Sequence, residues 1–118
     1  MAIKKSSKTV SLKAASDENV LLTITIGNAQ IGGNVVKFKN SSDVIGKGEI
    51  INLELGMGAD LSGRTLKVTT NILDVNEQTN GIVVTYFFSG CTPAATMFHD
   101  KVDNDGDIFS YLVEFNFK

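Results

Sequence analysis

The chain has 118 residues, of which 42% are hydrophobic, with a net charge of -2, one cysteine and no tryptophan. This length predicts one domain, residues 1–118, that buries a core without the help of a metal or a disulfide. The single cysteine, Cys91, excludes an intramolecular disulfide and every zinc or iron–sulfur site built from several cysteines.

Positive charge gathers in the first third of the chain. Residues 1–40 contain six lysines and two acidic residues, a net charge of +4, whereas the remainder contains five basic and eleven acidic residues, a net charge of -6. A nucleic-acid surface needs clustered cations beside stacking aromatic side chains, and these lysines are dispersed. We therefore expect no nucleic-acid partner, and we expect residues 1–7 to form a flexible basic tail.

The charged N-terminus is not followed by an apolar segment, and no apolar run approaches the roughly 18 residues that a membrane helix needs. The sequence thus predicts a soluble protein with no transmembrane segment. We expect a cytoplasmic protein if Met1 is the native start, and a secreted one if Met1 replaces a removed signal peptide.

The first half of the chain shows the period of two that is typical of half-buried strands. Residues 8–14, 20–26 and 34–39 alternate between apolar and polar side chains. The strand at 20–26 carries threonine instead of lysine on its outer face, so we expect an unprotected edge strand there. The glycine-rich residues 27–33 lack a phosphate-binding pattern and predict a flexible connection or a bulge.

The middle of the chain contains the segments with the least regular pattern. Residues 40–48 have the composition of a loop. Residues 49–55 alternate again and predict a strand with Ile51 on its inner face. The glycine-rich residues 56–63 are too short for more than a single helical turn.

Two long apolar runs, residues 64–75 and 82–89, flank the dipeptide Asn80-Gly81. Asn-Gly is the strongest short signal for a hairpin, because both residues tolerate the positive φ of a type I′ turn. We therefore predict that the two runs pair antiparallel. The second run is apolar at nearly every position, which predicts a central strand covered on both faces.

The last strand has the strictest alternation in the chain, and we expect it to close the core. From Phe109 to Phe117 the odd positions are all apolar and the even ones mostly polar. The segment 91–99 before it is the least strand-like part of the second half. About seven to eight short strands with almost no helix predict an all-β fold, an antiparallel β-sandwich, with a small β-barrel as the alternative.

The turn before the last strand contains the densest cluster of ligand-type side chains. Its four aspartates are Asp100, Asp103, Asp105 and Asp107. Calcium takes six to eight oxygen ligands, which an acidic loop supplies together with a neighbouring loop such as the one holding Asp43 or Asp60. The pattern is not that of an EF-hand, because Lys101 stands where the first ligand belongs. A calcium site and a solvated Asp-Gly turn therefore both stay open.

Cys91, His99 and Asp100 are the residue types of a nucleophile, a base and an orienting group. None of the local cysteine-protease signatures accompanies them, and a histidine beside an aspartate is typical of an exposed surface pair. This arrangement gives little support to an enzyme.

We expect a non-enzymatic protein-interaction or assembly module that presents a β-sandwich surface, self-associates or docks on another protein, and needs no cofactor. Two alternatives remain. One is a calcium-dependent β-sandwich that binds a carbohydrate or a membrane surface through the acidic loop 100–107. The other is a small cysteine-dependent enzyme.

Overall fold

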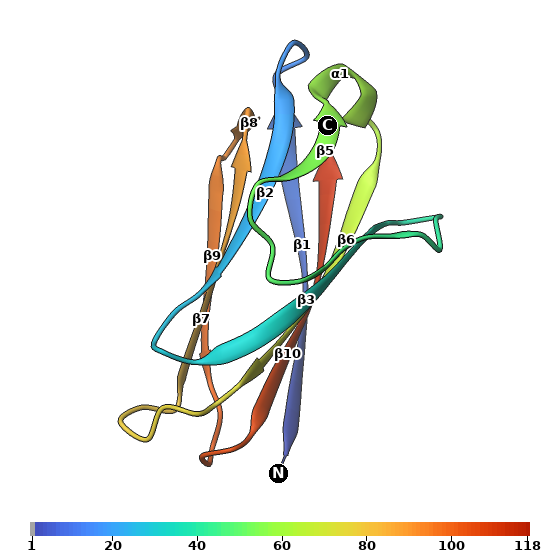
Figure 1. Ribbon diagram of the computed structural model, residues 1–118. Coiled ribbons are helices and arrows are strands. Elements are labelled where there is room, and N and C mark those ends of the chain that lie inside the picture. Colours follow the sequence, from blue (N-terminus) through green and yellow to red (C-terminus); the bar gives the residue numbers. More distant parts are fainter. Residues whose placement is uncertain (1) are drawn as a thin grey trace.

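The computed structural model describes residues 2–118, and about two thirds of them belong to the strands of two packed sheets (Figure 1). The sheets do not close into a barrel, so the predicted all-β sandwich is confirmed. No helix among residues 2–118 is long and apolar enough to cross a membrane.

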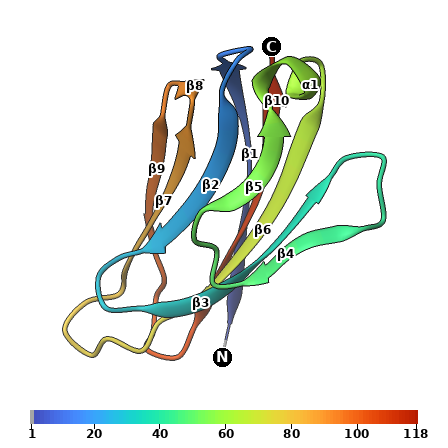
Figure 2. The ribbon, with the colours of Figure 1, turned by 45° about the horizontal axis from the view of Figure 1, so that its top comes forward.

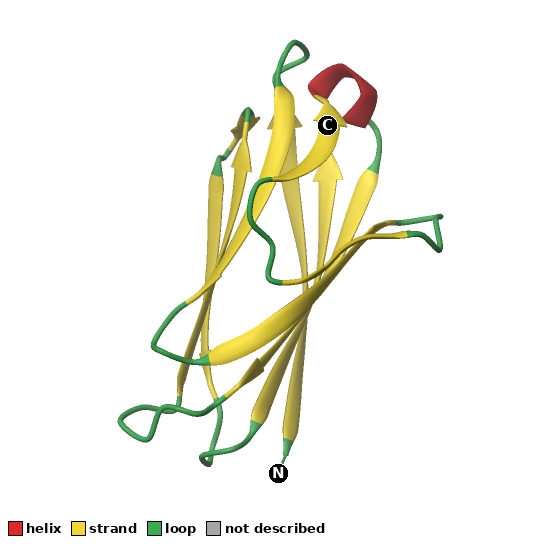
Figure 3. Cartoon of the chain, viewed as in Figure 1, coloured by secondary structure: helices red, strands yellow, loops and turns green. Residues whose placement is uncertain are grey.

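Residues 2–118 form ten strands and one helical turn. Figure 3 shows strands, helix and loops in different colours. The elements are β1 (Ile3–Ala14), β2 (Asn19–Ile26), β3 (Ile31–Phe38), β4 (Val44–Gly48), β5 (Leu53–Met57), α1 (Gly58–Leu61), β6 (Thr65–Leu73), β7 (Gly81–Ser89), β8 (Cys91–Thr92), β9 (Ala95–Lys101) and β10 (Ile108–Phe117). The count exceeds the expected seven to eight because β4, β8 and β9 fall in segments without a clear strand pattern. The single helical turn of α1 agrees with the prediction.

One sheet has the strand order β4-β3-β6-β10-β1-β8, and the other has the order β5-β2-β7-β9. Every pair of neighbours is antiparallel except β1 and β10, which run side by side in the same direction (Figure 1). The purely antiparallel sandwich that the sequence predicts is therefore wrong in this one pair. A parallel pair needs a long connection, and here the whole chain between the first and the last strand supplies it.

β10 lies between β6 and β1 and carries the centre of the core. Its inward residues, Phe109, Tyr111, Val113, Phe115 and Phe117, are each at most 5% exposed. The Phe115 ring lies 5.2 Å from the Tyr86 ring and 4.7 Å from the Phe88 ring of the other sheet. The prediction that the last strand closes the core is confirmed.

The hairpin predicted at Asn80-Gly81 is wrong, because β6 and β7 lie in different sheets. The connection between them crosses from one sheet to the other and is held by Gln30. The Gln30 side-chain oxygen accepts hydrogen bonds from the backbone amides of Val75 (2.8 Å) and Asn76 (2.9 Å). The apolar faces of β6 and β7 thus meet across the core, not side by side. β7 is central in its sheet, but its outer face is not covered, since Phe87 is exposed.

Residues 3–7, expected in a flexible tail with residues 1 and 2, are the first part of β1 and pair with β10. Met1 lies outside the described residues. The expectation failed because the ladder is made by backbone groups, which do not depend on the polar side chains of this segment.

The segments 40–48 and 49–55 also differ from expectation. The second half of the predicted loop is β4, and the strand predicted at 49–55 begins only at Leu53. Ile50 is buried and Ile51 is 62% exposed, so the predicted alternation is reversed here. The cause is Asn52, whose φ of 50° interrupts the extended chain and resets which residues face inward.

The edge strand predicted at 20–26 is wrong for the first half of β2, where β5 pairs with residues 19–22 and β7 lies on the other side. Residues 23–26 pair with β7 only, and on their other side the Ile24 amide donates to the Ile50 carbonyl at 3.0 Å. The outward threonines of β2 cover a sheet face, where the Thr23 hydroxyl accepts a hydrogen bond from the Asn52 amide at 2.9 Å. The edges of the two sheets are instead formed by β4, β5, β9 and, along most of its length, β1.

Candidate functional site

β1 has a partner strand on only one side over ten residues, within the part of the chain that the structure describes. Ile3 to Leu12 pair with β10, while the two-residue strand β8 on the other side pairs only with Lys13 and Ala14. The ladder with β10 is regular along its whole length. This leaves a long and straight sheet edge.

Two backbone hydrogen bonds define which residues of β1 face the free side. The Ile108 amide donates to the Ala2 carbonyl at 2.9 Å, and the Lys118 amide donates to the Leu12 carbonyl at 2.8 Å. The backbone N–H and C=O groups of even-numbered residues therefore point toward β10. Those of odd-numbered residues point away from it, because alternate residues of a strand direct these groups to opposite sides. The residues that direct these groups to the free side are Ile3, Lys5, Ser7, Thr9 and Ser11.

β9 is the second free edge, and the same argument applies to it. The Val102 amide donates to the Asn80 carbonyl at 3.0 Å, and the Phe88 amide donates to the Ala94 carbonyl at 2.7 Å. The backbone groups of even-numbered β9 residues therefore point toward β7. The residues that direct their backbone groups away from β7 are Ala95, Met97, His99 and Lys101.

The free edges of β1 and β9 lie on the same side of the sandwich, here named the β1–β9 side. The Lys8 ammonium lies 5.5 Å from the centre of the Phe98 ring, which spans the two strands. β4 and β5 form the other side, the β4–β5 side, and Figure 2 shows β9 and β4 at opposite margins of the molecule.

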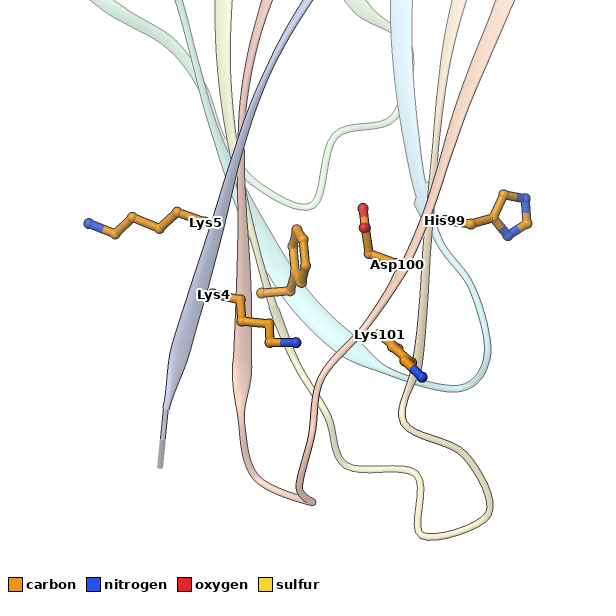
Figure 4. Close-up of a pocket in the computed structure, with 6 residues that line it drawn as sticks. Lys4, Lys5, His99, Asp100 and Lys101 are labelled. Atoms are coloured by element: carbon orange, nitrogen blue, oxygen red, sulfur yellow. The ribbon is translucent and has the colours of Figure 1, made fainter.

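A shallow pocket lies between the two free edges (Figure 4). Its lining residues are Lys4, Lys5, His99, Asp100, Lys101 and Phe109. Lys4 extends into the space between the strands and Lys5 points away from it, while Asp100 points inward and His99 outward. These directions follow from the alternation of each strand.

The opening between the sheets is filled by aromatic side chains. The Tyr111 hydroxyl donates to the Asp100 carboxylate at 2.6 Å, and the Phe98 ring stacks on the Tyr111 ring at a centroid distance of 5.7 Å. Burial raises the pKa of Tyr111, and the hydrogen bond to Asp100 and its charge raise it further. The core is thus closed here by aromatic side chains.

The β1–β9 side is strongly basic in a protein whose net charge is -2. β1 contains four lysines and no acidic residue, and β9 adds one lysine and one aspartate, so the two strands together carry five cations against one acid, a net +4. The charged residues are Lys4, Lys5, Lys8, Lys13, Asp100 and Lys101.

The four aspartates of the acidic turn have different surroundings. Asp100 is bonded to Tyr111, and Asp103 is exposed with an oxygen 3.3 Å from the Lys4 ammonium. Asp105 is exposed in the turn. Asp107 is buried and accepts hydrogen bonds from the backbone amides of Ala2 (2.9 Å) and Asn104 (3.1 Å).

The backbone hydrogen bonds lower the pKa of Asp107, that from Ala2 above all, against the opposing effect of burial. Among residues 2–118 no three His, Cys, Asp or Glu side chains are grouped so as to hold a metal ion. Asp43 precedes β4 and Asp60 lies in α1, which Figure 1 shows at the end of the sandwich away from the acidic turn. The calcium site remains a prediction without a formed ligand set.

Cys91, His99 and Asp100 are not brought together. Cys91 pairs with Ala14, whereas His99 lies beside Lys5, and nine residues of extended strand at about 3.3 Å each separate these two levels by roughly 30 Å. Cys91 is 7% exposed, and its burial raises the pKa of the thiol. Its environment is that of an unreactive core thiol.

The free edge of β1 was not recognised in the sequence. One signal was present: Lys4, Ser6 and Lys8 occupy the inward positions of a strand, where a central strand would carry apolar side chains. Comparison with known proteins adds nothing to this geometry, since no family model, no curated protein and no solved structure matches the chain.

Proposed function

We propose that this protein is a non-enzymatic interaction module that takes up an extended segment of another protein as an added strand on the free edge of β1. The observation that carries the proposal is the row of five consecutive odd-numbered residues, Ile3 to Ser11, whose backbone groups have no partner within residues 2–118. An exposed edge of this kind is a template for strand addition.

The length and regularity of the edge favour such a partner. Ten residues exceed the average strand, and the register with β10 contains no bulge. Each backbone hydrogen bond with an added strand contributes roughly 0.5–1.5 kcal/mol net. A segment that pairs along the whole edge therefore gains enough to offset part of the entropy lost on binding.

The charge of β1 favours a different protein over a second copy. Antiparallel pairing of two β1 edges would place four lysines against four lysines. Like charges on facing strands destabilise the pair. Light scattering over a dilution series should therefore show a monomer at low ionic strength, and a stable dimer there would favour self-assembly instead.

The positions of the reactive side chains support a non-enzymatic role. The Cys91 thiol is buried, and His99 lies on the outer face of another strand, near the opposite end of the molecule. Slow labelling of Cys91 by a thiol reagent at neutral pH is the expected result, and rapid labelling would contradict this point.

The proposal is tested by selecting binders from a displayed library of random decapeptides, with the variant Ser7→Pro as the counter-screen. The Ser7 amide points to the free side, so proline there removes a donor from the edge without removing a bond to β10. We expect ligands that bind the wild type and not Ser7→Pro, while Ser7→Ala retains binding. If every selected ligand binds the wild type and Ser7→Pro equally, the edge is not the site.

A further inference from the structure

We infer that the segment bound by β1 is acidic, with two carboxylate side chains four residues apart that face Lys4 and Lys8 between the sheets. This inference rests on the proposed strand addition and names the chemistry of its partner. It is carried by the direction and spacing of these two lysines together with the charge of the β1–β9 side.

The direction of the lysines follows from the register with β10. Lys4 pairs with Phe109 and Lys8 pairs with Val113, and both β10 residues point into the core. Residues paired across a ladder point to the same face of the sheet, so both lysines project from the inner face of β1. Ser6 lies between them and presents a small side chain.

The spacing between Lys4 and Lys8 determines where the acidic residues of the bound segment must lie. Four residues of strand span roughly 13 Å, and an added strand has the same rise per residue. Carboxylates at positions i and i+4 of the partner therefore come beside the ammonium groups of Lys4 and Lys8. The residue between them faces Ser6, where a small or β-branched side chain fits.

Both lysines are available to a partner. Lys4 contacts Asp103 at 3.3 Å, but this pair is exposed on both sides, and exposed ion pairs stabilise a protein little. Lys8 rests on the face of the Phe98 ring. The acidic residue of β9, Asp100, already accepts the hydrogen bond from Tyr111.

The remaining charge of the β1–β9 side acts in the same sense. β1 and β9 carry a net charge of +4 in a chain whose net charge is -2, so their free edges form a positive region. The acidic turn borders this region at one end, where Asp103 contacts Lys4. Such a region attracts an acidic segment and orients it before contact, which raises the rate of association.

The outer face of the sheet gives the partner a second feature. Ile3 continues a row of aliphatic side chains that crosses the sheet through Ile108, Leu73 and Ile31, each paired with the next. Ile3 and Ile31 are 56% and 55% exposed. A strand added beside β1 extends this row, so the outward residue opposite Ile3 is expected to be aliphatic.

The test is fluorescence anisotropy with the labelled peptide Thr-Glu-Val-Thr-Val-Glu-Val-Thr, which places its two glutamates and its valines on opposite faces. Matched peptides carry glutamine or lysine in place of glutamate. Two further copies are N-methylated at the even or at the odd positions, and a thymidine oligonucleotide serves as a non-peptide polyanion. The proteins are the wild type, Ser7→Pro, the double variant Lys4→Glu/Lys8→Glu and the control Lys37→Glu/Lys47→Glu, whose changes lie on β3 and β4.

We expect the glutamate peptide to bind the wild type about tenfold more tightly than the glutamine peptide, as two exposed ion pairs provide. The variant Lys4→Glu/Lys8→Glu should prefer the lysine peptide, whereas Lys37→Glu/Lys47→Glu should keep the wild-type preference. Only one of the N-methylated copies should lose binding, because only alternate amides of an added strand face β1.

Equal binding of the glutamate and glutamine peptides, with loss of both in Ser7→Pro, would overturn the acidic partner and leave strand addition intact. Binding of either peptide that is insensitive to Ser7→Pro would overturn strand addition itself. Tight binding of the oligonucleotide that is abolished in Lys4→Glu/Lys8→Glu, with no binding of the peptides, would assign the basic edge to a nucleic acid and overturn the inference.

Discussion

The two sides of this sandwich expose sheet edges of opposite character. On the β4–β5 side both edge strands have five residues, and each pairs with its neighbour through a register irregularity, one after Val36 and one after Val20. The two edges also approach each other closely, since a Cβ atom on Gly46 would lie 2.7 Å from the Leu53 side chain. On the β1–β9 side the edge of β1 is regular over ten residues.

The difference shows two ways of protecting a sheet edge. Short and irregular strands present few aligned backbone groups, so β4 and β5 are poor templates for an incoming strand of any sequence. The edge of β1 has aligned groups and is protected by its lysines, a protection that depends on the sequence of the incoming strand. Charge repels a basic strand or a second copy of β1, and it attracts an acidic one.

The hydrogen bonds of the two buried tyrosines also differ between the centre of the sandwich and the β1–β9 side. In the centre, Tyr86 of β7 bonds to the Thr70 hydroxyl at 2.7 Å, Thr70 donates to Asn34 at 2.7 Å, and Asn34 donates to the Gly48 carbonyl at 3.0 Å. This relay links the two sheets and reaches β4. Burial raises the pKa of Tyr86 despite its hydrogen bond with Thr70. On the β1–β9 side the corresponding bond of Tyr111 ends on Asp100, which is exposed.

Two proline substitutions on β1 give the largest expected difference in stability and test whether one side of this strand is free. Ser6→Pro removes a donor to β10 and leaves a carbonyl without its partner, which should lower the free energy of unfolding by about 1–3 kcal/mol. Ser7→Pro changes an amide on the free side, where proline is tolerated, and should remain within about 1 kcal/mol of the wild type. Denaturant unfolding of both variants measures the difference. Equal losses would show that the odd-numbered amides are not free.

The hydrogen bonds of Thr70 in the centre should contribute more to the free energy of unfolding than the bond between Tyr111 and Asp100 on the β1–β9 side. Thr70→Val keeps the shape of the side chain but leaves the Tyr86 hydroxyl and the Asn34 carbonyl oxygen buried without their partner, at a cost of about 2 kcal/mol. Tyr111→Phe removes a hydroxyl whose partner is exposed to water, and should cost under about 1 kcal/mol. Thermal or denaturant unfolding compares the two, and a larger loss for Tyr111→Phe would reverse this ranking.

Much of this architecture was readable from the sequence, and the exceptions have physical causes. The alternation from Phe109 to Phe117 and in β2 predicted the inward residues, because a buried face requires apolar side chains. The pairing of strands was less predictable. Asn80-Gly81 resembles a hairpin turn, yet its connection crosses between sheets, and the partner that holds it, Gln30, is distant in the sequence. The free edge depends on which strand lies beside β1, which no local pattern encodes.

The carboxylate of Asp107 ties the start of β1 to the acidic turn, and this link should weaken in acid. The pKa of Asp107 is lowered in the folded protein. The ionised carboxylate therefore contributes fully to folding stability above its ordinary pKa of 3.8, and this contribution is lost as the pH falls through the lower pKa of the folded state. Asp107→Asn places an amide group against a backbone N–H and should remove this part of the acid dependence.

The matched control is Asp105→Asn, since Asp105 is exposed in the same turn. Thermal unfolding of both variants between pH 2 and pH 6 provides the measurement. An acid profile of Asp107→Asn identical to that of the wild type would contradict the structural role of this carboxylate.

Addition of calcium should have the smallest effect on the stability of the protein. Asp107 is engaged by two backbone amides and Asp100 by Tyr111, so their oxygens are already used in the fold. We expect the melting temperature of chelator-treated protein to stay within about 1 °C on addition of millimolar calcium, since a ligand that does not bind the folded state does not stabilise it. A rise of several degrees that disappears in Asp103→Asn/Asp105→Asn would instead establish the calcium site.

The most direct test of the free edge is residue-resolved hydrogen exchange of β1, measured by NMR on dilute protein with and without the glutamate peptide. The amides of Lys4, Ser6, Lys8, Val10 and Leu12 should exchange slowly throughout, because they face β10. Those of Lys5, Ser7, Thr9 and Ser11 should exchange rapidly in the free protein and become protected when the peptide is bound. If odd and even amides exchange alike in the free protein, or if the bound peptide leaves the odd amides unprotected, the edge of β1 is not the site of strand addition.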